Sequence, residues 1–260
     1  MAKPLIGSID IISTAWQNLI KHWRAYAELV IWSAFVSLIY WIIGILTRTY
    51  TDDVTIAGLV YSLATLPVSI LVAIITIAFT DLTAKALQDK KVDVRESMMV
   101  GVHKLFSFIW LVILITLVNL AGFILFIIPA IIFDVWFAFA TNAFVVDGIK
   151  GRGALAASRA LVVGRWWGVL ARLVLPGAFI YLAVRFALAL AYLLFGSVLG
   201  DPGLFFGPVS DLYAVSRLQS LAMTVIPQIF VSFGVALFTA ANLVLWFDLK
   251  KKPRVELARP

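Results

Sequence analysis

The sequence predicts an all-α integral membrane protein with six transmembrane helices. Of its 260 residues, 63% are hydrophobic and 13% are charged, and the mean hydropathy is +1.03, a composition unlike that of a soluble globular protein. Several apolar runs reach the roughly 20 residues that a helix needs to cross about 30 Å of hydrocarbon. These runs do not alternate apolar and polar residues, which argues against an outer-membrane barrel. We therefore expect a single transmembrane domain over residues 1–260.

Charged residues, glycine and proline divide the apolar runs into six predicted spans. The spans cover residues 27–47, 55–80, 105–127, 130–146, 166–198 and 218–247. Spans three and four are separated only by Ile128 and Pro129. A proline cannot continue the hydrogen-bond ladder of the preceding turn, so a tight hairpin is predicted there instead of one very long helix.

The Lys and Arg residues outside the spans predict the orientation, because basic residues are retained on the cytoplasmic side. Most of the 21 basic residues fall in alternate connections and in the two ends of the chain. The other connections contain only Arg48 and Arg217. We therefore expect a multi-pass protein of a prokaryotic inner membrane with both ends in the cytoplasm. The net charge of +7 then points to anionic lipid headgroups and not to nucleic acid.

A polar segment with helical periodicity precedes each odd-numbered span. In the first, Ile12, Ala15, Trp16, Leu19 and Trp23 fall on one helical face, as in helices that lie in the membrane interface. The sequence is therefore interpreted as three hairpins, each preceded by a cytoplasmic amphipathic helix. The alternative is that any multispan protein needs such basic and aromatic belts, without an internal repeat. The predicted amphipathic segments cover residues 1–26, 81–104 and 148–165, the hairpins 27–80, 105–147 and 166–247, and a basic tail 248–260.

Residues suited to lipid headgroups cluster where each amphipathic segment ends. Trp and Arg side chains prefer the headgroup level of a bilayer. Arg172 lies about 9 Å inside its span, so its side chain is expected to extend back to the headgroups. The predicted headgroup contacts are Trp23, Arg24, Lys104, Arg152, Arg159, Arg165, Trp166, Trp167 and Arg172.

The run IIPAIIFDVWFAFATNAFVVDGIKGRGALAASRALVVGRWWGVL resembles the signature of an uncharacterised group of bacterial and archaeal membrane proteins. That group includes the YciC-like proteins and the membrane domain of glycerophosphoryl diester phosphodiesterases. The matching positions are Pro129, Asp147, Gly148, Ala154, Leu155, Ser158, Gly164 and Trp166. The resemblance implies a multispan membrane fold. It implies no enzyme activity, because the phosphodiesterases work through a separate soluble domain that has no counterpart in this sequence.

Two opposite charges within the predicted spans are the best candidates for an intramembrane site, since charges there are costly unless paired or hydrated. Asp134 in span four and Arg185 in span five lie at comparable depth by a rise of about 1.5 Å per residue. One interpretation is an ion pair between the two spans. The other is that each side chain extends separately to the outer surface.

No set of residues in the sequence points to an enzyme or to a cofactor. There is no cysteine, the only histidines are His22 and His103, and no nucleotide-binding, zinc or nucleophile motif is present. We therefore expect no enzyme activity, no cofactor and no metal.

The sequence favours a non-enzymatic membrane protein that binds lipids or protein partners, in envelope organisation or lipid handling. A homo-oligomer is one form that a protein partner would take. The alternative is a small-solute or lipid transporter or channel with a site near Asp134 and Arg185. An intramembrane enzyme ranks third.

Overall fold

The computed structural model describes residues 5–50, 53–125, 127–198 and 217–252 of the chain. Within these ranges the secondary structure is helical throughout, with no β-strand. The predicted basic tail is thus described only as far as Lys252, and most of the connection between spans five and six lies outside the described residues. The helices are α1 (Ser8–Lys21), α2 (Trp23–Tyr50), α3 (Val54–Leu87), α4 (Val94–Leu125), α5 (Ile127–Phe137), α6 (Ala140–Val145), α7 (Arg152–Val162), α8 (Trp166–Val198) and α9 (Arg217–Lys251).

Six helical segments are long and apolar enough to cross a membrane, which confirms the six predicted apolar spans. By length and composition, the chain is a multi-pass membrane protein. The segments are Trp23–Thr47, Thr55–Leu87, Val94–Ile124, Ile128–Val145, Trp166–Val198 and Gln219–Lys251.

The helix boundaries differ from the sequence prediction at three places. Residues 94–104 are not a separate amphipathic helix, because α4 continues through them without a break. By contrast, α1 ends at Lys21 and α7 ends at Val162, where Gly164 with φ +85° leads the chain into α8. The fourth span is divided into α5 and α6 by a turn before Ala140. Pro129 lies within the first turn of α5, where its missing N–H needs no partner.

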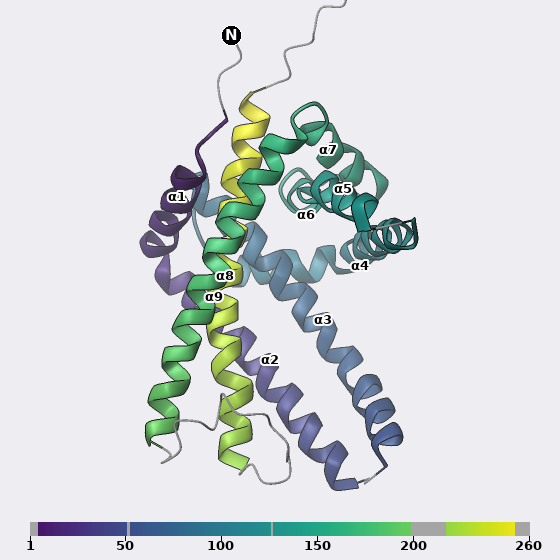
Figure 1. Ribbon diagram of the computed structural model, residues 1–260, viewed down its shortest axis with the longest axis vertical. Coiled ribbons are helices and arrows are strands. Elements are labelled where there is room, and N and C mark those ends of the chain that lie inside the picture. The colour runs from purple at the N-terminus through teal and green to yellow at the C-terminus, as the bar shows by residue number, and fades with distance from the viewer. Residues whose placement is uncertain (1–4, 51–52, 126, 199–216, 253–260) are drawn as a thin grey trace, which may run out of the picture.

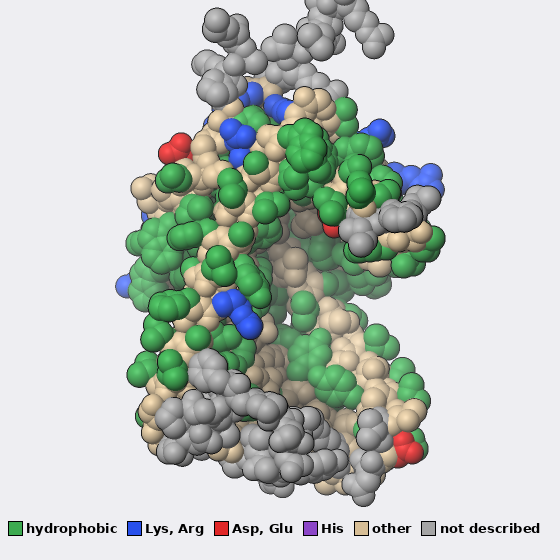
Figure 2. Space-filling model, in the orientation of Figure 1, with side chains coloured by type: hydrophobic (Ala, Val, Ile, Leu, Met, Phe, Trp, Pro, Cys, Tyr) green, Lys and Arg blue, Asp and Glu red, His purple; other side chains and the backbone are tan. Residues whose placement is uncertain are grey.

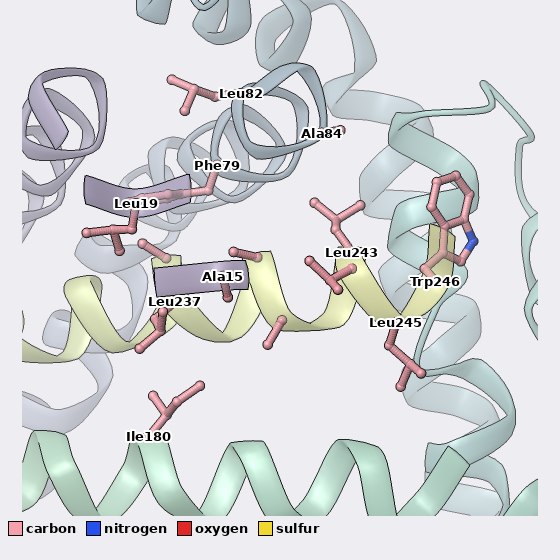
Figure 3. Packing of buried hydrophobic residues seen from close by; sticks show 14 of the residues in the cluster. Ala15, Leu19, Phe79, Leu82, Ala84, Ile180, Leu237, Leu243, Leu245 and Trp246 are labelled. Atoms are coloured by element: carbon pink, nitrogen blue, oxygen red, sulfur yellow. The ribbon is translucent and has the colours of Figure 1, made fainter. Parts of the chain in front are cut away.

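The helix α9 forms the centre of the packing. It contacts α1, α2, α3 and α8, and Leu243, Leu245 and Trp246 near its end are fully buried. Figure 3 shows these side chains on α9, with Leu19 of α1 and Phe79 of α3 on one side and Ile180 of α8 on another. Segments from both ends of the sequence therefore share one hydrophobic core.

The ends of the described chain lie on the same side of the molecule (Figure 1). We call this side, at which α1 begins and α9 ends, the terminal side. The helices α8 and α9 lie alongside each other, α8 beginning and α9 ending near this side, whereas α4 runs across their direction. In the space-filling view a hollow separates the part formed by α4 to α7 from the far ends of α2 and α3 (Figure 2).

Two glycines in α4 allow its close contacts with the neighbouring helices. A Cβ atom at Gly101 would lie 2.7 Å from the Ile74 carbonyl oxygen of α3, and one at Gly122 would lie 2.9 Å from the Ala130 Cα of α5. Both contacts are with backbone, which cannot give way as the tip of a side chain can. Small residues at such points let helix backbones approach each other in membranes.

Candidate functional site

One side of α1 packs on the protein. Ile11, Ala15 and Leu19 are almost completely buried, mainly against α9. Beside them, the Asn18 side-chain amide donates to the Tyr26 hydroxyl at 2.8 Å, and that hydroxyl donates to Thr83 Oγ1 of α3 at 3.0 Å. This buried chain of hydrogen bonds joins α1, α2 and α3. The sequence did not reveal it, because Asn18 is an ordinary polar residue of an amphipathic helix.

A second side of α1 is apolar and exposed. Ile9, Trp16, Ile20 and Trp23 are each between 45% and 81% exposed. The spacing of seven and four residues places Ile9, Trp16 and Ile20 on one stripe of α1, and Trp23 follows the corner as the first residue of α2. We call these four residues the outward stripe. Large apolar side chains exposed together in this way mark a surface that meets lipid or another protein.

The third side of α1 is polar and exposed. Asp10, Ser13, Thr14, Gln17 and Lys21 share it. The helix therefore has three faces, one packed on protein, one exposed and apolar, and one exposed and polar. The sequence prediction had merged the first two, grouping Ala15 and Leu19 with Trp16 and Trp23, because periodicity alone cannot separate adjacent apolar faces.

The start of α1 is held by a clamp between α8 and α9. Arg172 of α8 donates from Nε to the Ile6 carbonyl oxygen at 2.6 Å and from a terminal nitrogen to the Leu5 carbonyl oxygen at 3.4 Å. The Ile6 N–H donates to Asp248 Oδ2 of α9 at 3.1 Å, and Asp248 pairs with Lys252 at 2.7 Å. Arg172 is thus engaged by the backbone of residues 5–6, a partner that no local sequence signal indicates.

The corner between α1 and α2 carries His22. Burial lowers the pKa of His22 below its ordinary value of 6.5; the positive charge of Lys21 lowers it further, and Asp89 opposes the shift. Lys21 and Asp89 form an ion pair at 2.7 Å, and the hydrogen bond from Lys21 lowers the pKa of Asp89. The imidazole is therefore a neutral packing group near pH 7. The other histidine, His103, has Nδ1 2.7 Å from the Met99 carbonyl oxygen in α4.

The helix α7 has a different surface from α1. Its buried side contains Ala154, Leu155, Ser158 and Val162. The Ser158 hydroxyl donates to the Trp136 carbonyl oxygen at 2.7 Å and accepts from the Phe139 N–H at 3.1 Å, across the turn between α5 and α6. Its exposed side carries only small residues and arginines, with the Arg159 guanidinium 4.5 Å from the centre of the Trp136 ring.

The predicted headgroup residues divide into two groups. Trp23, Arg24, Arg152 and Trp167 are exposed, and the Arg24 guanidinium lies 5.6 Å from the centre of the Trp23 ring. The others are wholly or partly engaged by the protein. Lys104 donates to the Val145 carbonyl oxygen at 2.6 Å, and Arg165 donates to the carbonyl oxygens of Leu161, Leu249 and Lys252. Arg159 stacks on Trp136, and Trp166 packs edge-to-face on Trp167. Arg172 belongs to the clamp on residues 5–6.

The structure does not bring Asp134 and Arg185 together. Asp134 of α5 is exposed and accepts a hydrogen bond from the Asn119 side-chain amide of α4 at 2.6 Å. Arg185 of α8 is also exposed, with its guanidinium 6.0 Å from the centre of the Tyr181 ring. Within the described part of the chain, the ion pairs do not include one between these two residues.

Among the described residues, no group of three or more His, Cys, Asp or Glu side chains is arranged to hold a metal ion. Comparison with protein-family models, curated proteins and solved structures finds no match to the chain. The resemblance of residues 127–170 to the YciC-like group therefore stays a prediction. Function has to be inferred from the geometry of the residues themselves.

Proposed function

We propose that the chain is a non-enzymatic membrane protein that binds membrane lipids on its terminal side. The observation that carries the proposal is the outward stripe, in which Ile9, Trp16 and Ile20 of α1 are exposed between a face packed on α9 and a polar face, with exposed Trp23 at the start of α2. A helix with such faces fits the boundary of a bilayer, its apolar side roughly 5–10 Å below the headgroups.

The charge of the terminal side supports anionic lipid as the ligand. Arg24 stands next to Trp23 at the end of the outward stripe, at the level where Trp and Arg prefer to lie. Basic side chains gather near the end of α9 and beside α7 in Figure 2. Each Lys or Arg near an anionic surface contributes about 1 kcal/mol to binding. In this proposal the terminal side faces the cytoplasm, in the inner membrane of a prokaryote.

The proposal retains three successive hairpins, each preceded by an amphipathic segment. Contacts between α2 and α3, between α4 and α5, and between α8 and α9 support this pairing. Protein partners, including a second copy of the chain, are further ligands that the exposed apolar faces of the helices would accept. Lipid handling or envelope organisation is the role that fits such binding.

Thermal unfolding in nanodiscs tests the lipid-binding proposal. The protein is compared in discs of phosphatidylcholine and in discs that also contain phosphatidylglycerol, with and without high salt. We expect phosphatidylglycerol to raise the Tm and salt to reduce the increase, since salt screens interactions between exposed charges. An equal Tm in both discs would overturn the proposal.

A transporter or channel is the second candidate function, and Asp134 is the observation that favours it. Its carboxylate is exposed on a helix of the fourth span and is bonded to Asn119. An ionised carboxylate facing hydrocarbon costs about 2.5–3.5 kcal/mol or more, so water or a solute is a better neighbour.

Flux into liposomes tests this second candidate. Asp134→Asn is compared with Asp10→Asn, which changes the same residue type on the polar face of α1. Uptake that is lost only in Asp134→Asn would support transport. Absence of uptake by the unmodified protein, across cations, anions and short-chain lipids, would count against it.

A further inference from the structure

Two apolar grooves open beside α9. One, of about 550 Å³, lies between α2, α8 and α9 and includes Ile31, Phe35 and Leu38 of α2. The other, of about 410 Å³, lies between α1, α8 and α9 and includes Trp16 of α1 and Ala183 of α8. Both volumes are within the roughly 300–1,000 Å³ of protein sites for small ligands.

The two grooves lie end to end along one face of α9. The first is floored by Val225 and Ile226, and the second by Ile229, Phe233 and Leu237. Val225, Ile229, Phe233 and Leu237 follow one another at four-residue steps, and Ile226 lies three residues before Ile229, so all five face one side of α9; from Val225 to Leu237 they extend about 18 Å. We call this combined space the α9 furrow. Figure 3 shows Leu237 and Ile180, which line its second part, in the space between α9 and α8.

The furrow is suited to a hydrocarbon chain. Its surface is almost wholly apolar, and small residues, Ala183 and Ala187 of α8 and Ala222 of α9, leave the space unfilled. It also joins the outward stripe, because Trp16 belongs to both and packs edge-to-face on Phe233 with ring centres 6.2 Å apart. The furrow therefore continues directly from the surface that we propose to face lipid.

A cation lies on the same face of α2 as the residues that line the first groove. On α2, Arg24 precedes Ile31, Phe35 and Leu38 by seven, eleven and fourteen residues, so all four share one face. Arg24 is exposed and lies about 10 Å from Ile31 along the axis of α2. This is the separation expected between a phosphate at the membrane surface and an acyl chain below it.

We propose that the α9 furrow holds one acyl chain of an anionic phospholipid whose phosphate is bound by Arg24 beside Trp23. This site rests on the proposed lipid-binding function and gives that function a specific place. In this site α1 covers one end of the furrow. Trp16 lies over the acyl chain, and the polar face of α1 points toward water.

Photocrosslinking tests the site in the full-length protein. The probe is a phosphatidylglycerol with a diazirine on one acyl chain, used in phosphatidylcholine nanodiscs, with crosslinked residues identified by peptide mass spectrometry. Ile229 and Phe233 should crosslink, and unlabelled phosphatidylglycerol should compete about five- to tenfold better there than phosphatidylcholine, whose choline cation neutralises the phosphate charge that Arg24 would bind. Leu182 and Phe186 are the internal control. They face outward on α8, at 65% and 69% exposure, and should crosslink without preference for either competitor.

Two matched pairs of variants test where the acyl chain and the phosphate of the lipid bind. Ala183→Phe fills the furrow and should abolish the preferential competition, whereas Ala178→Phe, on the exposed opposite side of the same helix, should retain it. Arg24→Gln should remove the five- to tenfold preference without altering the packing of the furrow, and Arg152→Gln should not.

Several results would overturn the site. Equal competition by the two lipids at Phe233, unchanged in Arg24→Gln, would refute the binding of an anionic headgroup by Arg24. If competitors reduce crosslinking at Phe233 no more than at Leu182, the furrow contains only bulk lipid. If crosslinking at Phe233 is absent in a dimeric preparation, a second copy of the protein covers the furrow. If phosphatidylglycerol still raises the Tm after such results, the proposed function stands and only this site fails.

Discussion

The helices α1 and α7 each precede a span, and each has one side buried in the protein, yet their remaining surfaces differ. Outside its packed face, α1 presents a stripe of large apolar residues and then a polar face. Outside its packed face, α7 presents Arg152, Ala156 and Arg159. The difference teaches that amphipathicity alone does not identify an interfacial helix, because the apolar face of α7 packs on α4, α5 and α6. A further, exposed apolar face distinguishes α1.

The largest expected effect concerns how α7 is fixed. Ser158→Ala removes the partner of two buried backbone groups, the Trp136 carbonyl and the Phe139 N–H, and should lower the free energy of unfolding by about 2–4 kcal/mol. Ser13→Ala on the polar face of α1 is the matched control and should have little effect, since its hydroxyl bonds only the Asp10 carbonyl at an exposed site. Unfolding in mixed micelles with increasing SDS measures both. Equal losses would refute the tighter attachment of α7.

The next effect separates a lipid-facing surface from a water-facing one. Ile20→Asp places a carboxylate in the outward stripe and should destabilise the protein in bilayers by about 1–3 kcal/mol. Ala156→Asp on the exposed side of α7 should change stability by less than about 0.5 kcal/mol. Thermal unfolding in nanodiscs measures the two variants. If Ile20→Asp is as harmless as Ala156→Asp, the outward stripe faces water.

A smaller effect is expected at the clamp that holds the start of α1. Arg172→Ala leaves the Leu5 and Ile6 carbonyls without their donor and should cost about 1–2 kcal/mol, localised to α1. Faster amide hydrogen exchange in residues 8–21, with α7 unchanged, is the expected result. Arg152→Ala provides the control. Uniform exchange changes across both helices would show a global defect instead of a released clamp.

The smallest effect is the pH dependence of the corner between α1 and α2. Burial keeps the folded-state pKa of His22 below 6.5, so the unfolded chain takes up a proton first as the pH falls. Stability should therefore decrease as the pH falls below about 6.5 and level off once the folded state is also protonated. Tm values measured between pH 7.5 and 5 should lose this component in His22→Gln and keep it in His103→Gln. A pH profile identical in all three proteins would contradict the role of burial.

The six spans could be predicted because run length and hydrophobicity are local properties of the sequence. The breaks were harder, since the polar residues from Val94 to Lys104 resemble those before the other spans although the helix is continuous there. Whether such a segment separates from its span depends on local features, such as the left-handed Gly164 after α7. Residues 94–104 have no counterpart of this glycine break, because Gly101 is used for the contact with Ile74.

The side-chain partners in the candidate site could be predicted only in part. Trp23, Arg24 and Trp167 are exposed, and their contact with headgroups stays a prediction. The partners of Arg172 and Asp134 depend on tertiary contacts. Arg172 meets a backbone segment from the other end of the chain, and the side chain that reaches Asp134 is the Asn119 amide of the preceding helix. The comparable depth of Asp134 and Arg185 along their spans suggested that they are neighbours. Depth contains no information on the direction in which α4 and α5 run.

The clamp on residues 5–6 also determines when the start of α1 can be attached during biosynthesis. The Ile6 N–H bonds Asp248, which is synthesised 242 residues later, so this contact is closed only when α9 has emerged. At about 5–20 residues per second the interval is roughly 10–50 s. Until α9 follows, α1 lacks the helix on which most of its buried face packs. Adsorption to the membrane surface would protect the apolar side of α1 from aggregation during synthesis. The outward stripe would therefore also hold α1 at the membrane until α9 has been synthesised.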